Sequence, residues 1–253
     1  MSDPDQMAFM TRAELNARAP ESLLVLPIGA TEQHGPHLAV GTDHLAADHV
    51  ALEVARRLRG EVPVVVAPVV PYGHSPHHLP FGGTMSVTAD TYQRLLVELG
   101  TTAVVSGFRR IFLLNGHGGN VEIAAVAARE ISRIKDVPVA SGSYFIMAWD
   151  RLVAAGAADD VRLPGHAGAF ETSLMMALHP RAVKEERPVR SGSHGGATSS
   201  FFGPYHAAIP GQWEAIDGYS DDPSRADAAA GERYLEQVYE AVADQLRGFY
   251  RQT

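Results

Sequence analysis

Residues 110–120 read RIFLLNGHGGN, and this stretch joins two different patterns. The apolar run at 110–114 predicts a short buried strand, whereas residues 120–135 repeat apolar side chains at helical spacing. A glycine-rich turn separates the two. A strand that passes through such a turn into a helix is the unit from which parallel sheets are built.

The same alternation continues outward in both directions along the chain. Apolar and β-branched runs predict further strands at residues 22–28, at 62–70 and from 138 onward. Helical spacing and helix-start signals predict helices at residues 43–58, 88–107, 169–178 and 225–251. This order indicates βαβ units around a parallel sheet, and no linker divides the chain into separate domains.

The composition excludes several classes of protein. The chain has 253 residues, of which 45% are hydrophobic and 20% charged, as in a folded globular protein. Its formal net charge of −8 argues against a nucleic-acid partner, and the absence of cysteine excludes disulfides, thiolate metal sites and cysteine nucleophiles. No apolar run reaches the roughly 18–20 residues that span a membrane, and residues 1–12 lack a secretory signal core. We therefore expect a cytoplasmic protein with no membrane partner.

One long segment departs from the alternation. Residues 186–224 are rich in glycine, proline and serine, and they contain the aromatic side chains Phe201, Phe202, Tyr205 and Trp213. A loop of this length inside a compact domain is usually functional or part of an assembly surface. We expect it to act as a lid or as an oligomer contact.

Polar side chains gather where the predicted strands end and the predicted helices begin. These positions meet at one edge of a parallel sheet, where ligands bind in open α/β folds. Four segments supply them, with the sequences GATEQHGPH (29–37), GTDH (41–44), NGHGGN (115–120) and GHAGAFETS (165–173). Their histidines and carboxylates are ligand types that suit Zn²⁺, Mn²⁺ or Fe²⁺.

Each segment also has a simpler interpretation. Asp43 suits an ordinary helix cap, and Glu171 suits the positive end of a helix dipole. His34 and His166 suit polar loops. The turn at 115–120 is compatible with a phosphate cradle, but Val121 stands where the dinucleotide fingerprint needs its third glycine.

Taken together, the candidates favour a metal centre over these separate interpretations. Glu32, His34, Asp43, His117 and Glu171 supply two imidazoles and three carboxylates. This inventory suits two divalent ions about 3.5–4 Å apart that share one bridging carboxylate. A hydroxide between the ions would balance the remaining charge and act as a nucleophile at neutral pH.

Four motifs in this order resemble the creatininase (creatinine amidohydrolase) family, and the similarity extends from about residue 24 to 180. The motifs are LPIGATEQHGPHL (26–38), GTDHL (41–45), LLNGHGGN (113–120) and GHAGAFETSLMMAL (165–178). The resemblance implies a single three-layer α/β/α domain over residues 1–253 with a mostly parallel sheet, two divalent metal ions per chain, hydrolysis of amide C–N bonds, and a homohexamer.

The resemblance also implies roles for individual residues. The family's metal-binding Glu and His fall on Glu32 and His34, its bridging Asp on Asp43, and the His of its N-G-H motif on His117. Its proton-shuttle His falls on His166.

This chain departs from the creatinine-cleaving members at two places. Those members carry a metal-binding Glu two residues after the N-G-H histidine, where this chain has Gly119, and we assign the vacant role to Glu171 as ligand and catalytic group. They also hold the substrate between two tryptophans. Trp149 fits one of them, but only Leu163-Pro164 occupies the second position, which disfavours creatinine as substrate.

The sequence therefore predicts a dinuclear amidohydrolase, with His166 as proton shuttle in attack by a metal-bridged hydroxide. Its substrate is a small molecule, namely a cyclic amide, a formamide or a small peptide-like compound. The predicted substrate contacts are Trp149, His78, Asn115 and Gly118. The alternatives are a metal-dependent lactonase or isomerase acting on a sugar-like substrate, and a homologue of the mycofactocin peptidase. A non-catalytic binding protein is the least favoured.

Overall fold

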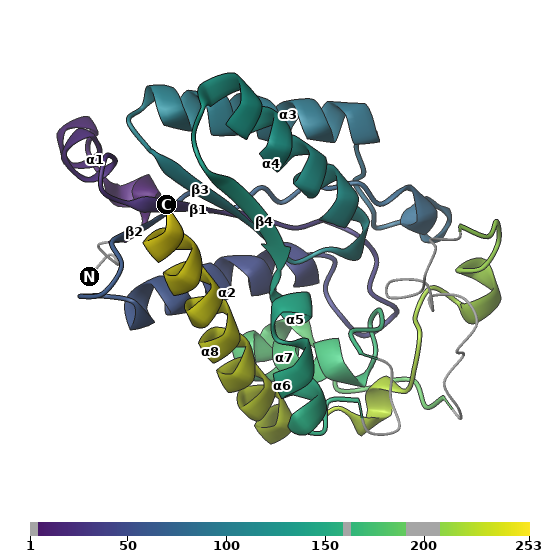
Figure 1. The fold of residues 1–253 in the computed structure, drawn as a ribbon. Helices are drawn as coiled ribbons and strands as arrows, with labels where there is room; N and C mark the ends of the chain where they lie inside the picture. The colour runs from purple at the N-terminus through teal and green to yellow at the C-terminus, as the bar shows by residue number, and fades with distance from the viewer. Residues whose placement is uncertain (1–4, 159–162, 191–207) are drawn as a thin grey trace.

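The computed structural model describes residues 5–158, 163–190 and 208–253 (Figure 1). Within them, the sheet is parallel and has the strand order β2-β1-β3-β4. Its strands are β1 (Leu23–Ile28), β2 (Val64–Val66), β3 (Arg110–Asn115) and β4 (Val139–Ser143). The predicted parallel α/β fold is confirmed.

Helices cover both faces of the sheet and form the two outer layers. One face carries α3 (Ala89–Val105) and α4 (Val121–Lys135), and the other carries α2 (Thr42–Arg57) and α8 (Ala228–Gln252) (Figure 1). The shorter helices are α1 (Arg12–Arg18), α5 (Tyr144–Met147), α6 (Trp149–Ala154) and α7 (Ala169–Leu178). None of the helices in the described residues is both long and apolar enough to cross a membrane.

Strand β1 shows why the sheet is buried on both faces. Every residue of β1 is buried, and alternate side chains point to opposite layers. Leu23 and Val25 join the core beneath α2 and α8, whereas Leu24 and Leu26 join the core beneath α3 and α4. A continuous apolar run is what a central parallel strand needs.

The strand order places a switch point between β1 and β3. From β1 the chain crosses over through α2 to β2, and it then returns through α3, on the opposite face, to β3 on the other side of β1. The connections leaving β1 and β3 therefore diverge, and a crevice opens at their carboxyl ends. The predicted site segments after residues 28 and 114 begin there.

Two predicted elements differ in extent from those observed. The strand predicted at 62–70 is regular only over Val64–Val66, with a separate bridge from Val70 to Ile28, because Pro63 and Pro68 have no N–H to donate to a ladder. The long segment 186–224 contains two short 3₁₀ helices in its described part, η6 (Glu214–Ile216) and η7 (Pro223–Arg225). Phe201, Phe202 and Tyr205 lie outside the described residues.

The close contact between α7 and α8 requires a glycine on α8. A Cβ on Gly231 would lie 1.9 Å from the backbone oxygen of Ser173 on α7, whereas a Cβ on Gly248 of the same helix would meet no atom within 4 Å. Because α7 carries Glu171, this contact also supports the candidate site.

We expect Gly231→Ala to lower the free energy of unfolding by about 1–3 kcal/mol, because the added methyl group forces the two helices apart. The matched variant Gly248→Ala should be neutral or stabilising by up to about 1 kcal/mol, because alanine is the better helix former. Urea denaturation of both variants tests this. Equal effects of the two substitutions would show that the helices do not pack as described.

Candidate metal centre

Six predicted site residues converge at the carboxyl edge of the sheet. Glu32 and His34 follow β1, Asp43 lies in the first turn of α2, and His117 follows β3. His166 and Glu171 come from the loop before α7 and from its first turn. All six side chains are buried. Separate segments thus deliver one compact group of imidazoles and carboxylates.

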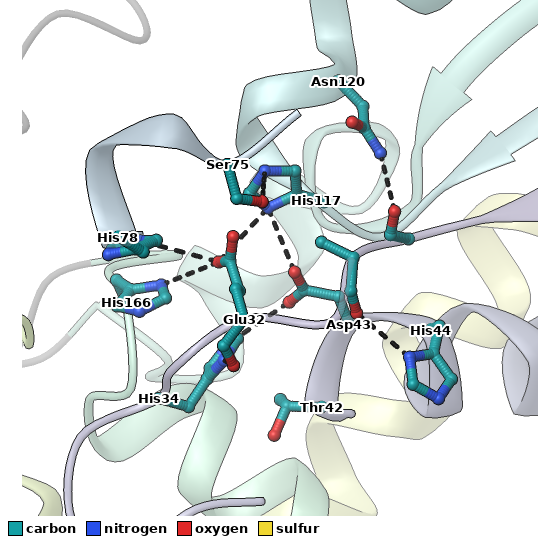
Figure 2. Close-up of polar contacts among 12 residues, drawn as sticks. Glu32, His34, Thr42, Asp43, His44, Ser75, His78, His117, Asn120 and His166 are labelled. Carbon is teal, nitrogen blue, oxygen red and sulfur yellow. Dashed lines mark hydrogen bonds and ion pairs between the residues drawn. The ribbon is translucent and has the colours of Figure 1, made fainter. Parts of the chain in front are cut away.

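The carboxylate of Asp43 lies between two imidazoles (Figure 2). Its Oδ1 is 3.2 Å from His34 Nε2, and its Oδ2 is 3.0 Å from His117 Nδ1. The N-cap of α2 is Gly41, and no side chain caps this helix. Asp43 is therefore not a helix cap, and its two oxygens face different histidines as a bridging carboxylate would.

Backbone carbonyls orient both histidines. His34 Nδ1 lies 3.1 Å from the carbonyl oxygen of Glu32 and donates to it, so Nε2 is left for a metal ion, or for a proton when no metal is bound. His117 Nε2 lies 3.2 Å from the carbonyl oxygen of His74 and donates there, which leaves Nδ1 in the same way. One ring nitrogen held by a backbone carbonyl is typical of metal-binding histidines.

Several buried atoms at this point make no hydrogen bond. Both carboxylate oxygens of Glu32, His34 Nε2 and Asp43 Oδ2 are enclosed without a hydrogen-bond partner. Burying carboxylates in this way is unfavourable unless a cation neutralises them. The unsatisfied atoms are hard or borderline ligands, and the group therefore fits divalent metal ions.

In the described residues, three overlapping groups of side chains could each hold a metal ion, because the ligand atoms within each group lie within 4.8 Å of one another. The sets are His34–Asp43–Glu171, Glu32–His77–His117 and Glu32–His34–His166. Glu171 belongs with His34, whose Nε2 is 3.8 Å from Glu171 Oε2. The structure thus places Glu171 on the His34 side of Asp43.

Protons occupy this centre when no metal does. Burial opposes the charge on His34, but the surrounding carboxylates, Asp43 foremost, outweigh it and raise the His34 pKa to about 10. The carboxylates of Glu32 and Asp43 likewise raise the pKa of His117 despite its burial. Burial raises the pKa of Glu171 to about 8. These groups hold protons that a metal ion would displace.

His166 lies beside this centre and contacts Glu32, whereas the two oxygens of Asp43 face His34 and His117. Its Nε2 is 2.9 Å from the carbonyl oxygen of Gln33 and donates to it, and its Nδ1 is 3.5 Å from Glu32 Oε1. Its backbone N–H donates to Ser220 Oγ at 2.8 Å, which anchors the loop. Burial and the neighbouring His78 lower the His166 pKa well below its usual range, so the ring is neutral.

A narrow cavity of about 40 Å³ opens onto the centre. Its lining includes the glycine turn Gly116–Gly119 and the rings of His77, His78 and Trp213. Trp213 contacts all three neighbouring imidazoles, with its ring centroid 4.7 Å from that of His78, 5.3 Å from that of His166 and 5.5 Å from that of His77. The cavity suits a planar group in contact with a backbone turn and aromatic rings.

The predicted substrate contacts divide into two pairs. His78 and Gly118 line this cavity, whereas Asn115 and Trp149 are absent from its lining. Asn115 instead shapes the turn, because its Nδ2 donates to the His117 carbonyl at 2.6 Å and its Oδ1 accepts from the His117 N–H at 3.1 Å. Trp149 packs against the core on the α2–α8 side of the sheet.

Sequence reasoning missed Phe145 and underrated Trp213, both of which line the cavity. Phe145 follows the end of β4, so the rule that places ligands at strand ends would have found it. Trp213 carries no such signal, because it lies in a long segment without strand or helix periodicity.

A second, larger cavity of about 530 Å³ lies between α4, β4 and α8. Its lining includes Phe112, Ser141, Met147, Gln245 and Phe249 and contains no ionisable side chain. It offers no acid, base or metal ligand, so the chemistry belongs to the narrow cavity.

Known proteins are similar to this chain over most of its length. A sequence profile described as "Creatininase: Creatinine amidohydrolase" matches residues 8–246. The mycofactocin precursor peptide peptidase of Mycobacterium tuberculosis is 32% identical, over 94% of this chain and 88% of its own length. The creatinine amidohydrolase of Pseudomonas putida is 32% identical, over 94% of each chain. A solved structure described as "Creatininase Mn" superposes with a TM-score of 0.79 at 30% identity, covering 96% of this chain and 98% of its own.

Asn120 ties three loops of the site together. Its Nδ2 donates to the Gly29 carbonyl and the Tyr92 hydroxyl, each at 3.0 Å, and its Oδ1 accepts from the His74 N–H at 3.1 Å (Figure 2).

We expect Asn120→Ala to lower the free energy of unfolding by about 2 kcal/mol or more, because it leaves several buried polar groups unsatisfied. Tyr92→Phe removes one of these bonds and should cost about 1 kcal/mol. Urea denaturation of both proteins in metal-free form measures this, and equal losses would contradict it.

Metal affinity should rise with pH. Between pH 6 and 8, His34 is protonated in the metal-free protein, because this range lies below its pKa of about 10. Each ion that displaces one proton should bind about tenfold more tightly per unit rise in pH. Competition with a chromophoric chelator at pH 6, 7 and 8 measures the dissociation constants. Affinity that does not change with pH would show that the site is already deprotonated.

Proposed function

This chain belongs to the creatininase (creatinine amidohydrolase) family and is a metal-dependent hydrolase of C–N bonds, and we propose that it uses two divalent ions to cleave a small peptide-like amide. Zn²⁺, Mn²⁺ and Fe²⁺ all suit its histidine and carboxylate ligands. His34, Asp43 and Glu171 would hold one ion, and Glu32, His117 and the second oxygen of Asp43 the other.

One observation carries the proposal. The buried ligand atoms of Glu32, His34 and Asp43 make no hydrogen bond, and they converge from two segments of the chain. A protein that only bound a neutral ligand would have no use for so many uncompensated polar atoms, because each costs stability. When bound, two divalent ions polarise a carbonyl group and supply a water molecule of lowered pKa.

His166 is positioned to move a proton between attacking water and leaving group. Its Nε2–H is held by the Gln33 carbonyl, so only Nδ1 is available, and Nδ1 faces Glu32 at the reaction centre. Because the ring is neutral, Nδ1 can accept a proton from the attacking water. The imidazolium then donates the same proton to the leaving nitrogen as the C–N bond breaks.

The cavity shape supports a planar amide as substrate. The backbone of the Gly116–Gly119 turn and the rings of His78 and Trp213, which all line the cavity, would contact the amide plane. The 32% identity to a peptide peptidase over 94% of this chain favours a peptide-like compound. A cyclic amide is the second candidate, because the identity to a creatinine amidohydrolase is equal.

We expect His166→Ala to keep its metal ions and to lose turnover by about 10²–10⁴-fold, because the proton shuttle is removed and the ligands remain. Elemental analysis of chelator-free protein measures the ions. Turnover is measured on short peptides, formamides, cyclic amides and lactones. The matched control is His49→Ala, whose ring packs on Tyr239 away from the site and whose loss should leave turnover unchanged.

Three outcomes would contradict the proposal in different ways. Wild-type protein that neither contains nor takes up divalent ions would exclude metal-dependent hydrolysis. Unchanged kcat in His166→Ala would exclude the proton shuttle alone. Cleavage of lactones in preference to every amide would indicate the sugar-type alternative.

A further inference from the structure

The two ligand sets around Asp43 each contain one imidazole and two carboxylates. On one side, Asp43 Oδ1 is joined by His34 Nε2 and Glu171 Oε2. On the other side, His117 Nδ1 lies 3.0 Å from Asp43 Oδ2 and 3.3 Å from Glu32 Oε1. The turn that carries His117 adds nothing more, because it continues as Gly118 and Gly119.

Gly119 allows the turn to pack closely against the chain at residue 74. A Cβ at this position would lie 2.4 Å from the carbonyl oxygen of His74 and 2.6 Å from His117 Nε2. The turn therefore packs directly against the chain at residue 74. The segment that follows residue 74 is therefore held close to this side of the centre and can supply an additional ligand.

His77 lies in that segment and faces the second ligand set. It is on the 3₁₀ helix η2 (Pro76–Phe81), and it forms a set with Glu32 and His117 whose ligand atoms lie within 4.8 Å of one another. Its ring is nearly parallel to that of His117, at 6° with 6.2 Å between centroids. It also lines the narrow cavity.

The neighbouring histidines of this segment are less suited to bind an ion. His74 Nδ1 lies 3.1 Å from the carbonyl oxygen of Val87. His78 Nδ1 accepts from Gln33 Nε2 at 2.8 Å, so its N–H is on Nε2, which lies 3.6 Å from Glu32 Oε1 as a donor. No hydrogen bond to either ring nitrogen of His77 occurs within the described part of the chain.

We propose that His77 is a ligand of the ion held by Glu32, His117 and Asp43, an inference that rests on the proposed two-ion site. This ion then has two imidazoles and two carboxylates, whereas the other has one imidazole and two carboxylates. Imidazole suits zinc, iron and nickel, and carboxylate suits manganese. The His77 side is therefore the more selective for zinc over manganese.

The test is a metal titration of the full-length protein after removal of its ions by chelation. Zn²⁺ and Mn²⁺ are added separately in competition with a chromophoric chelator, which gives the number of ions and each dissociation constant. We expect His77→Ala to leave one ion at wild-type affinity and to weaken the other by more than the ~10–100-fold typical of outer-shell partners. The matched control, His74→Ala, should bind both ions as the wild type does.

Two further substitutions sharpen the result. His77→Glu should restore the second ion and shift its preference toward Mn²⁺, because a carboxylate replaces the imidazole. His77→Gln repeats the test with a polar side chain of similar size, in case alanine impairs folding. Visible absorption of the Co²⁺-loaded proteins should change in His77→Ala but not in His74→Ala, because the spectrum reports the ligand set.

The outcomes separate this inference from the proposed function. Two ions bound by His77→Ala and His77→Gln with wild-type dissociation constants would overturn the role of His77 and leave the two-ion site standing. Two ions bound at wild-type affinity by Asp43→Ala would overturn the two-ion site itself. Loss of one ion in His77→Ala together with loss of both in Asp43→Ala supports both statements.

Discussion

The carboxylate of Asp43 between two imidazoles is the contact on which the rest of the site depends. It requires the first turn of α2 to lie against the carboxyl ends of β1 and β3. Glycines make that approach possible, because a Cβ on Gly29 would lie 2.6 Å from the His44 backbone nitrogen and one on Gly116 would lie 2.6 Å from the Asp43 carbonyl oxygen. These glycines follow the strands because the helix start leaves no room for a side chain.

Backbone groups, more than side chains, orient the ligands. The carbonyl oxygens of Glu32 and His74 hold the Nδ1 of His34 and the Nε2 of His117, and the Gln33 carbonyl holds His166 Nε2. Such acceptors do not rotate as a carboxylate or amide side chain would. The orientation of each imidazole is therefore set by loop backbone, and the loops are in turn fixed by the sheet and by Asn120.

The sequence predicts the site residues that lie directly after a strand or at the start of a helix. Glu32, His34, Asp43 and His117 were predictable because parallel strands bring their carboxyl ends together, and this rule needs only a correct assignment of strands and helices. The side of Asp43 on which Glu171 lies, and the packing of Trp149 in the core, depend on distances between elements far apart in the chain. Trp213 has no local pattern, and the strand at 62–70 is shortened by prolines whose effect depends on which neighbours it pairs with.

The residues at the base of the cavity are constrained by the packing of the core, whereas those at its mouth lie in loops. At the base, Glu32, His34, Asp43 and His117 come from strand ends and a helix start, where a displacement would disturb the buried core. The mouth is built from loops and short 3₁₀ helices that carry His77, His78 and Trp213. Loops can change without cost to the core, so we infer that these loops set the choice of substrate. A ligand at His77 would link the two, because the residue that shapes the entrance would also hold an ion at the base.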